Sequence, residues 1–256
     1  MDRRVRRRGV SQVNAILRRE QTLSGWGRTS PSRSTVWEPD RIDQVAAIVR
    51  EPVEDSARGV IARGLGRSYG DAAQNAGGQV VSSAAIDRIL EFDAERGTIR
   101  VEAGVSLDAL LHFLVPRGWF PTVIPGTAFV SVGGAIAADI HGKFRHGSFC
   151  DYVERATLVT PALGPIEIDP QRTPNEFWAT AGGMGLTGVV TEATLKQLLP
   201  TMNVVPDRLV SLTESFLARS LSLMPLKKTE EAARLFLCAH IACEQYRYPE
   251  LLKLRL

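Results

Sequence analysis

The stretch "ARGLGRSYGD", Ala62–Asp71, places three glycines, two arginines and a tyrosine directly behind a β-branched run. That run predicts a strand, so the glycines fall where the strand ends. Glycine lacks a Cβ atom, which lets main-chain N–H groups approach an anion closely. Gly64, Gly66 and Gly70 spell GxGxxxG rather than the GxGxxG of a Rossmann turn. The stretch therefore indicates phosphate binding, with a tight turn that needs positive φ as the alternative.

Two further clusters of small residues follow along the chain. "IPGTAFVSVGGAIA" covers residues 124–137, and "ATAGGMGLTG" covers residues 179–188. Hairpin turns favour Asn-Gly or Asp-Gly pairs, whereas these clusters mix small apolar residues with Ser and Thr, whose hydroxyls are additional donors. Three such loops predict one cradle around a long ligand with a charged middle. Three unrelated turns are the alternative.

Short strands dominate the sequence up to about residue 200, with few helices between them. Helices are expected over residues 42–49 behind Asp40 as N-cap, over 107–114 behind Ser106, and within the small-residue run 131–143. A hairpin is expected over residues 152–168, and further strands are expected over 59–64, 79–83, 89–93, 98–104, 122–125 and 186–198. These elements predict an α+β fold.

Composition excludes several classes of protein. The 256 residues have a net charge of +3 at pH 7, and much of it lies in "RRVRRRG" at the start. Nucleic-acid-binding proteins are usually more basic and cluster lysines with aromatic residues, so no nucleic acid partner is expected. No apolar run approaches the ~20 residues that span a bilayer, so no transmembrane segment is expected.

The cysteines indicate neither a disulfide framework nor a metal site. There are three, an odd number, which suits a reducing compartment. The segment "CAHIAC", residues 238–243, resembles a metal motif. A zinc site needs about four ligands at recognised spacing, so a buried helix face is favoured there and no metal is expected.

Four motifs in a fixed order carry a family resemblance: "GWGRT", "ARGLGRSYGDAAQN", "PGTAFVSVGGAIAADIHGK" and "FWATAGGMGLTGVV". Together they resemble the FAD-binding half of vanillyl-alcohol-oxidase-type flavoproteins, over roughly Ser24 to Leu198. The resemblance implies a PCMH-type FAD-binding domain of two α/β subdomains over residues 24–200. Residues 1–23 are then expected to be a basic, disordered head, and residues 201–256 a short, divergent helical tail that replaces most of a substrate domain.

The resemblance also implies which residues contact FAD. In the first loop these are Arg63, Gly64, Leu65, Gly66, Arg67, Ser68 and Tyr69. In the second they are Gly126, Thr127, Ser131, Gly134, Ala137, Ile140 and His141. In the third they are Gly185 and Val190.

Three of the matching positions are implied to be catalytic: Tyr69, His141 and Lys143. His141 and Lys143 match family positions beside the isoalloxazine and the substrate, where a cation would face negative charge on the reduced flavin. A hydrogen-bonded core histidine and a solvated lysine are the alternatives. The first loop contains no histidine for a covalent flavin bond, so FAD is expected to be non-covalent. Trp26 is expected either to wall the substrate pocket or to belong to the core.

Within the family, the match is closest to oxidases of lipid-linked pentose phosphates that serve cell-wall arabinan synthesis. The resemblance therefore implies hydride transfer from a sugar carbon to flavin, with a short-chain reductase as a partner subunit. The implied location is the cytoplasm, with association at the membrane or cell envelope as an alternative. An aldonolactone or alditol oxidase shares the same FAD half and stays open.

The sequence departs from the family in two respects. Met184 stands where relatives have asparagine, and the loop after Lys143 is shorter. The tail from about Ser211 resembles no part of a substrate domain, so a truncated, catalytically inactive flavin-binding module is one hypothesis. A working oxidase whose other half lies on another chain is the second.

Overall fold

The computed structural model describes residues 16–50, 58–142, 147–196 and 198–200. Four strands form the first sheet, in the order β1-β2-β4-β3. β1 runs antiparallel to β2, whereas β2, β4 and β3 are parallel neighbours. Val80 and Val81 of β4 are fully buried, as expected for a central parallel strand. The bounds are β1 Leu17–Leu23, β2 Ser32–Glu38, β3 Val60–Arg63 and β4 Gln79–Ser82.

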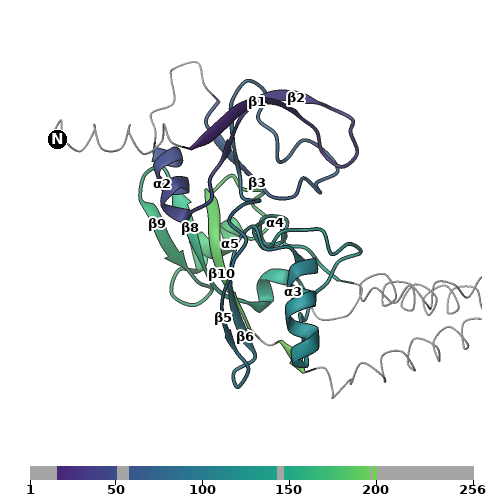
Figure 1. Ribbon diagram of the computed structural model, residues 1–256. Helices are drawn as coiled ribbons and strands as arrows, with labels where there is room; N and C mark the ends of the chain where they lie inside the picture. Colours follow the sequence, from purple (N-terminus) through teal and green to yellow (C-terminus); the bar gives the residue numbers. More distant parts are fainter. Residues whose placement is uncertain (1–15, 51–57, 143–146, 197, 201–256) are drawn as a thin grey trace, which may run out of the picture. The chain divides into compact units, whose positions relative to one another are not determined.

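Five antiparallel strands form the second sheet, in the order β5-β6-β10-β8-β9 (Figure 1). The central strand β10 is β-branched and almost wholly buried. β8 and β9 form the predicted hairpin, and a two-stranded ladder joins β7 and β11. The bounds are β5 Ile89–Asp93, β6 Thr98–Glu102, β7 Trp119–Phe120, β8 Val153–Thr160, β9 Gly164–Ile168, β10 Val189–Leu195 and β11 Leu199–Pro200.

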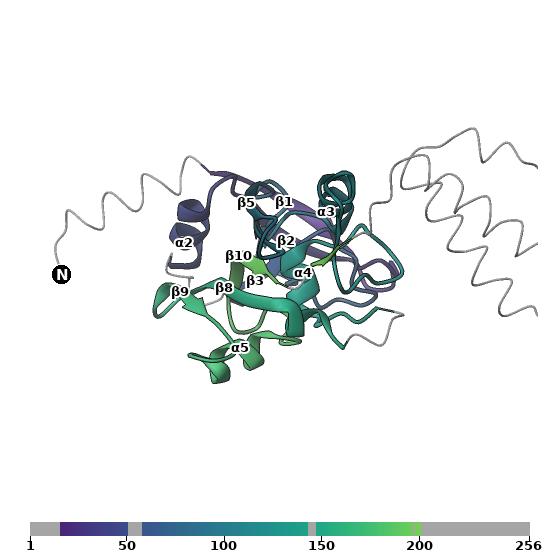
Figure 2. The ribbon, with the colours of Figure 1, turned by 90° about the horizontal axis from the view of Figure 1, so that it is seen from below.

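Helices cover parts of both sheets (Figures 1 and 2). Ser106 caps α3 as predicted, because its side chain accepts a hydrogen bond from Ala109 N at 3.0 Å. The small-residue run also opens a helix, α4, at Ser131. The bounds are α2 Ile42–Arg50, α3 Leu107–Leu114, α4 Val132–Ala137 and α5 Pro174–Thr180, with 3₁₀ turns η1 Val115–Arg117 and η2 Phe149–Tyr152.

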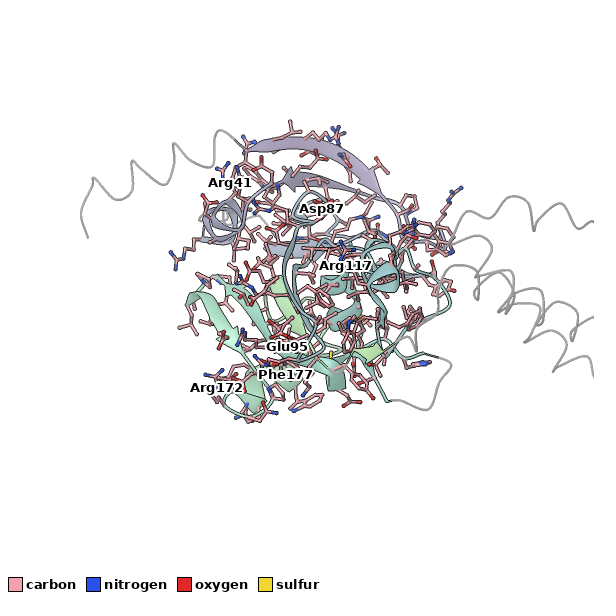
Figure 3. All side chains as sticks on the ribbon, turned by 60° about the horizontal axis from the view of Figure 1, so that its bottom comes forward. Arg41, Asp87, Glu95, Arg117, Arg172 and Phe177 are labelled. Carbon is pink, nitrogen blue, oxygen red and sulfur yellow. The ribbon has the colours of Figure 1, made fainter. Side chains whose placement is uncertain are left out.

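The apolar core has two main parts. In the larger, α3, α4 and α5 pack on the five-stranded sheet, with Leu110 and Phe177 among its buried side chains. In the smaller, α2 packs between the two sheets through Val45 and Ile48. Figure 3 shows Phe177 among its neighbours, while Arg172 nearby is exposed and pairs with Asp169 and Glu167. The mixture of two sheets and helices confirms the predicted α+β class.

Two expectations are wrong in detail. Residues 122–125 form no strand; the only strand near them is the short β7. The head was expected to be disordered through residue 23, yet Leu17–Leu23 pair with β2 along their whole length. This strand lies at the edge of its sheet and is mostly polar and exposed, so it lacks the apolar alternation that reveals a strand in sequence.

The rest of the head (residues 1–15), the tail (201–256) and the segment 238–243 lie outside the described residues. Among the described residues, no helix is long and apolar enough to cross a membrane.

Candidate functional site

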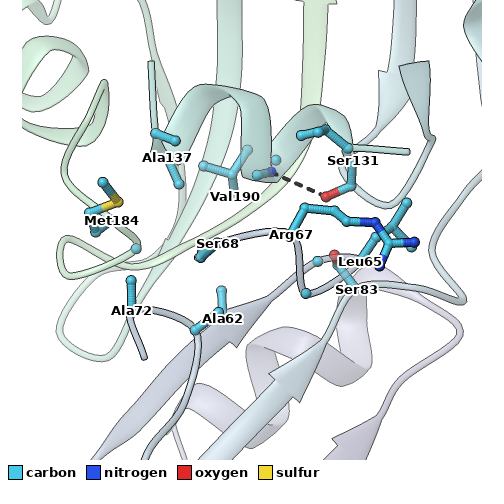
Figure 4. Close-up of a pocket in the computed structure, with 18 of the residues that line it drawn as sticks. Ala62, Leu65, Arg67, Ser68, Ala72, Ser83, Ser131, Ala137, Met184 and Val190 are labelled. Atoms are coloured by element: carbon cyan, nitrogen blue, oxygen red, sulfur yellow. Dashed lines mark hydrogen bonds between the residues drawn. The ribbon is translucent and has the colours of Figure 1, made fainter. Parts of the chain in front are cut away.

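One cleft gathers residues of all three glycine-rich loops (Figure 4). Its volume is about 390 Å³, which is within the usual range for a ligand pocket. It lies where the loop after β3 faces α4 and the loop between α5 and β10. Most of the residues expected to contact the cofactor line it: Gly64, Leu65, Gly66, Arg67, Ser68, Tyr69, Ser131, Gly134, Ala137, Ile140, Gly185 and Val190.

The first loop and α4 touch at Gly64. A Cβ atom at this position would overlap the Ser131 hydroxyl. That hydroxyl accepts a hydrogen bond from Gly134 N at 3.2 Å and so caps α4. Any side chain at Gly64 would therefore separate the loop from the helix, and the two walls of the cleft join only because residue 64 is glycine.

The backbone of the first loop uses two of its acceptors and leaves its donors free. Among the described residues, the main-chain amides of 65–69 donate to no protein acceptor. By contrast, the carbonyl of Ser68 accepts from Trp26 N at 2.7 Å, and that of Tyr69 accepts from Gly27 N at 3.1 Å. All five residues of 65–69 line the cleft. Successive free amides of this kind form a concavity suited to an anion.

Arg67 gives the cleft its charge. Of the described residues that line the cleft, it alone is charged. Its guanidinium, which has five N–H donors, makes no hydrogen bond or ion pair with any described residue. It lies 4.7 Å from the centroid of the Trp26 ring. A cation with free donors and no carboxylate beside it favours a negatively charged ligand.

Trp26 belongs neither to the core nor to the lining of the cleft. Its side chain is 55% exposed, so the expectation of a core tryptophan is wrong. It does not line the cleft but covers one face of Arg67, which does.

Arg63 lies behind the loop and does not line the cleft, unlike the other first-loop residues expected to contact the cofactor. Its Nη1 donates to the carbonyl of Ala73 at 3.0 Å, and its Nη2 donates to the carbonyl of Ser24 at 2.8 Å. Burial lowers the pKa of this guanidinium from its ordinary value. The hydrogen bonds indicate that Arg63 shapes the loop from behind.

The third loop is tied to α4 by two backbone hydrogen bonds. Gly182 N donates to the carbonyl of Ile136 at 3.0 Å, and Met184 N donates to that of Ala137 at 2.8 Å. Met184 lines the cleft with φ at +53°. This left-handed region is costly for a side chain such as methionine and is best tolerated by Gly or Asn. The position is therefore held by its surroundings rather than by its own preference.

Besides Arg63, three described site residues that were expected in the cleft do not line it. Gly126 and Thr127 are exposed and precede the part of the second loop that lines it. His141 is also exposed and forms an isolated bridge with Ser148. Lys143 lies outside the described residues, so its position stays a prediction.

Several lining residues are not among the contacts that the family resemblance implies. Most of them still lie within the three glycine-rich stretches: Ala62, Gly70, Val130, Gly133, Thr180, Met184 and Gly188. Ala72, Ala73 and Ala138 lie directly beside these stretches. Ser83 follows the end of β4, and only the fold brings it to the cleft.

These features test whether a dinucleotide fits the site. The close approach at Gly64, the free amides of 65–69 and the unpartnered Arg67 suit a diphosphate. The remaining lining is mostly small and apolar, as a nucleotide's ring systems require. Among the described residues, no group of three or more His, Cys, Asp or Glu side chains is placed to hold a metal ion.

An α+β fold with an anion-binding cleft of this kind defines a nucleotide-binding domain. The family described as FAD binding domain matches residues 34–167, which is more than half of the chain. The chain belongs to this family, and the prediction of FAD as its cofactor is confirmed. A second family, origin recognition complex subunit 6, matches residues 195–254, most of which lie outside the described residues.

Oxidases and dehydrogenases are among the proteins similar to this chain. Decaprenylphosphoryl-beta-D-ribose oxidase of Mycolicibacterium smegmatis is 44% identical over 182 residues, which is 70% of this chain and 39% of that protein. Mitochondrial L-galactono-1,4-lactone dehydrogenase of Brassica oleracea is 28% identical over 68% of this chain and 29% of its own length. D-arabinono-1,4-lactone oxidase of Eremothecium gossypii is 25% identical over 73% of this chain and 36% of its own length. The chain thus spans well under half the length of each.

Proposed function

We propose that this chain is the FAD-binding part of an oxidoreductase that oxidises a sugar hydroxyl of a lipid-linked pentose phosphate. The observation that carries the FAD-binding half of the proposal is the donor set of the cleft, the free amides of 65–69 beside Arg67. The substrate half rests on the 44% identity to decaprenylphosphoryl-beta-D-ribose oxidase.

The described residues have distinct tasks in this proposal. The amides of 65–69 and the guanidinium of Arg67 bind the diphosphate, because together they offer more donors than one side chain could. Ser131, Gly134 and Ala137 of α4 form the opposite wall. No histidine lines the cleft among the described residues, which supports non-covalent binding.

Catalysis requires residues beside the isoalloxazine ring, at the end of the cofactor where the sugar of the substrate binds. When bound, FAD supplies an acceptor for hydride from the carbon that bears the sugar hydroxyl. Tyr69 is 79% exposed at the lining of the cleft, where it can contact a substrate. His141 and Lys143 are assigned to this end by the family resemblance alone. A substrate domain, in this chain or a partner chain, then excludes water.

The proposal extends to location and partners. A lipid-linked substrate would bring a cytoplasmic protein to the membrane or cell envelope. A short-chain reductase that reduces the keto sugar on the opposite face is the proposed partner subunit.

A lactone or alditol oxidase is the alternative enzyme, favoured by the similarity to the two lactone-oxidising relatives. A catalytically inactive flavin-binding module is the alternative outside the enzymes.

The test uses the full chain, purified and supplied with FAD. A yellow protein that releases free FAD on acid treatment supports non-covalent binding, and a colourless protein that FAD fails to stabilise overturns it. The flavoprotein is then mixed anaerobically with decaprenylphosphoryl-ribose, L-galactono-1,4-lactone or an alditol. Bleaching by the first supports the proposed substrate, bleaching by either of the others supports the alternative enzyme, and bleaching by none supports the inactive module.

A further inference from the structure

We propose that Trp26, on the segment Ser24–Gly27, is a positioning residue that holds Arg67 and the first glycine loop ready for the diphosphate. This inference rests on the proposed FAD binding and assigns a role to the "GWG" motif, which does not line the cleft. It concerns how the cleft achieves its shape before any ligand arrives.

The backbone of this segment fixes the acceptors of the loop. The amides of Trp26 and Gly27 donate to the carbonyls of Ser68 and Tyr69 at 2.7 and 3.1 Å. A Cβ atom at Gly25 would overlap the carbonyl oxygen of Gly70, so the two segments touch backbone to backbone. These two carbonyl oxygens already accept hydrogen bonds, so they are not free to turn toward a phosphate and repel it. The free amides of the same loop are then left to face a ligand in the cleft.

The side chain of Trp26 fixes the charge. Its ring lies over the guanidinium of Arg67 at 4.7 Å, within the range of a cation–π interaction. Stacking uses a face of the guanidinium and leaves its N–H donors, which lie in the plane of the group, available. No other described residue bonds this guanidinium. Without the ring, Arg67 would lose its only described restraint and sample several rotamers.

A positioned arginine binds an anion more tightly than a mobile one, because less side-chain entropy is lost on binding. Removing the ring should therefore weaken FAD binding by roughly 2- to 5-fold, the scale of one exposed cation–π contact. Since Trp26 is 55% exposed, its loss should hardly alter the stability of the apoprotein.

The experiment measures FAD affinity for the full chain and for Trp26→Leu, Trp26→Phe, Arg67→Met and the double variant Trp26→Leu/Arg67→Met. Trp178→Leu is the matched control, because Trp178 is 47% exposed on α5 and does not line the cleft. We expect weaker binding for Trp26→Leu and Arg67→Met, near-normal binding for Trp26→Phe, and no change for Trp178→Leu. The double variant should bind no more weakly than Arg67→Met alone, because Trp26 acts through Arg67.

Salt dependence separates positioning from a purely structural effect. Arg67→Met should make FAD affinity less sensitive to ionic strength, and Trp26→Leu should do so in part. The inference is overturned if Trp26→Leu binds FAD as the parent does, or if its loss adds fully to that of Arg67→Met. It is also overturned if Trp26→Leu lowers the free energy of unfolding of the apoprotein by as much as it lowers the free energy of FAD binding. Failure of the parent chain to bind FAD would overturn the proposed function itself, so the two failures are distinguishable.

Discussion

Two glycines, one from the first glycine-rich loop and one from the second, differ in how closely they are enclosed. Gly64 of the first loop lies against Ser131, where a Cβ atom would overlap the hydroxyl. Gly126 of the second loop has no atom within 4 Å of a Cβ position and has no positive φ. The difference shows that a glycine is required only where two segments touch or where the backbone turns left-handed.

The same contrast separates two arginines of one loop. Arg63 donates to two backbone carbonyls behind the loop, whereas Arg67 has no described hydrogen-bonding partner and lines the cleft. Arg63 is expected to stabilise the apoprotein, and Arg67 is expected to bind the ligand. Variants can therefore separate the framework of the site from its binding surface.

The largest effect is expected for Gly64→Ala. The added methyl group must displace Ser131, and overpacking of this kind costs about 1–3 kcal/mol of folding free energy. Separation of the loop from α4 should also reduce FAD affinity by roughly 100-fold, which corresponds to a binding loss of similar size. Chemical denaturation and FAD titration measure the two effects. Normal FAD affinity in this variant would contradict the claim that the contact between the first loop and α4 at Gly64 is needed for binding.

Arg63→Met should follow in size. It removes two hydrogen bonds at a half-buried position, where a typical hydrogen bond contributes about 0.5–1.5 kcal/mol. We expect the free energy of unfolding to fall by about 2 kcal/mol. Arg67→Met is the control and should change stability by no more than ~0.5 kcal/mol while weakening FAD binding. Equal destabilisation by both variants would contradict the division between them.

Cys150→Ala tests the support beneath the second loop. Cys150 is buried, and its Sγ lies 3.6 Å from the carbonyl of Ile136 in α4. Burial, together with a hydrogen bond to Asp139, raises the pKa of this thiol far above its ordinary value. Because the folded pKa is the higher one, the stabilisation is complete below the unfolded pKa of about 8.5 and is lost as pH rises above it.

Cys150→Ala should therefore lower the free energy of unfolding by about 1 kcal/mol at pH 7. The difference in unfolding free energy between the parent and the variant should narrow between pH 8.5 and 10. Urea denaturation at several pH values measures it. If this difference instead widened with rising pH, the thiol would have a lower pKa in the folded state than in the unfolded state, which contradicts the prediction.

The smallest effect is expected for Gly126→Ala. The position is exposed and open, so the change in stability should stay within ~0.5 kcal/mol. FAD affinity should be unchanged, because Gly126 does not line the cleft. A marked loss of affinity in the titration would mean that the second loop reaches the ligand further than its lining residues indicate.

Sequence predicted the local features of this site better than the long-range ones. The first loop was recognisable because its glycines and arginines lie within ten consecutive residues. The direction of Arg63 was not, because adjacent residues in one loop can point to either side of it. Ser83 reaches the cleft from just after β4, far from any glycine-rich stretch, and no local pattern in the sequence indicates that contact.

The fold shows the same limit. α3 was predictable from its apolar spacing and its cap at Ser106. β1 was not predictable, because its residues are mostly polar and exposed and do not alternate between apolar and polar. Only its pairing with β2 defines it as a strand. Pairing is a property of two segments, so a single stretch of sequence does not contain it.

The most direct test of the shared cleft is a crystal structure of the full chain grown with FAD. We predict that the diphosphate oxygens lie about 3 Å from the main-chain nitrogens of 65–69, with Arg67 bonded to the same group and α4 facing it. A diphosphate bound elsewhere, with these amides and Arg67 turned to solvent, would contradict the account.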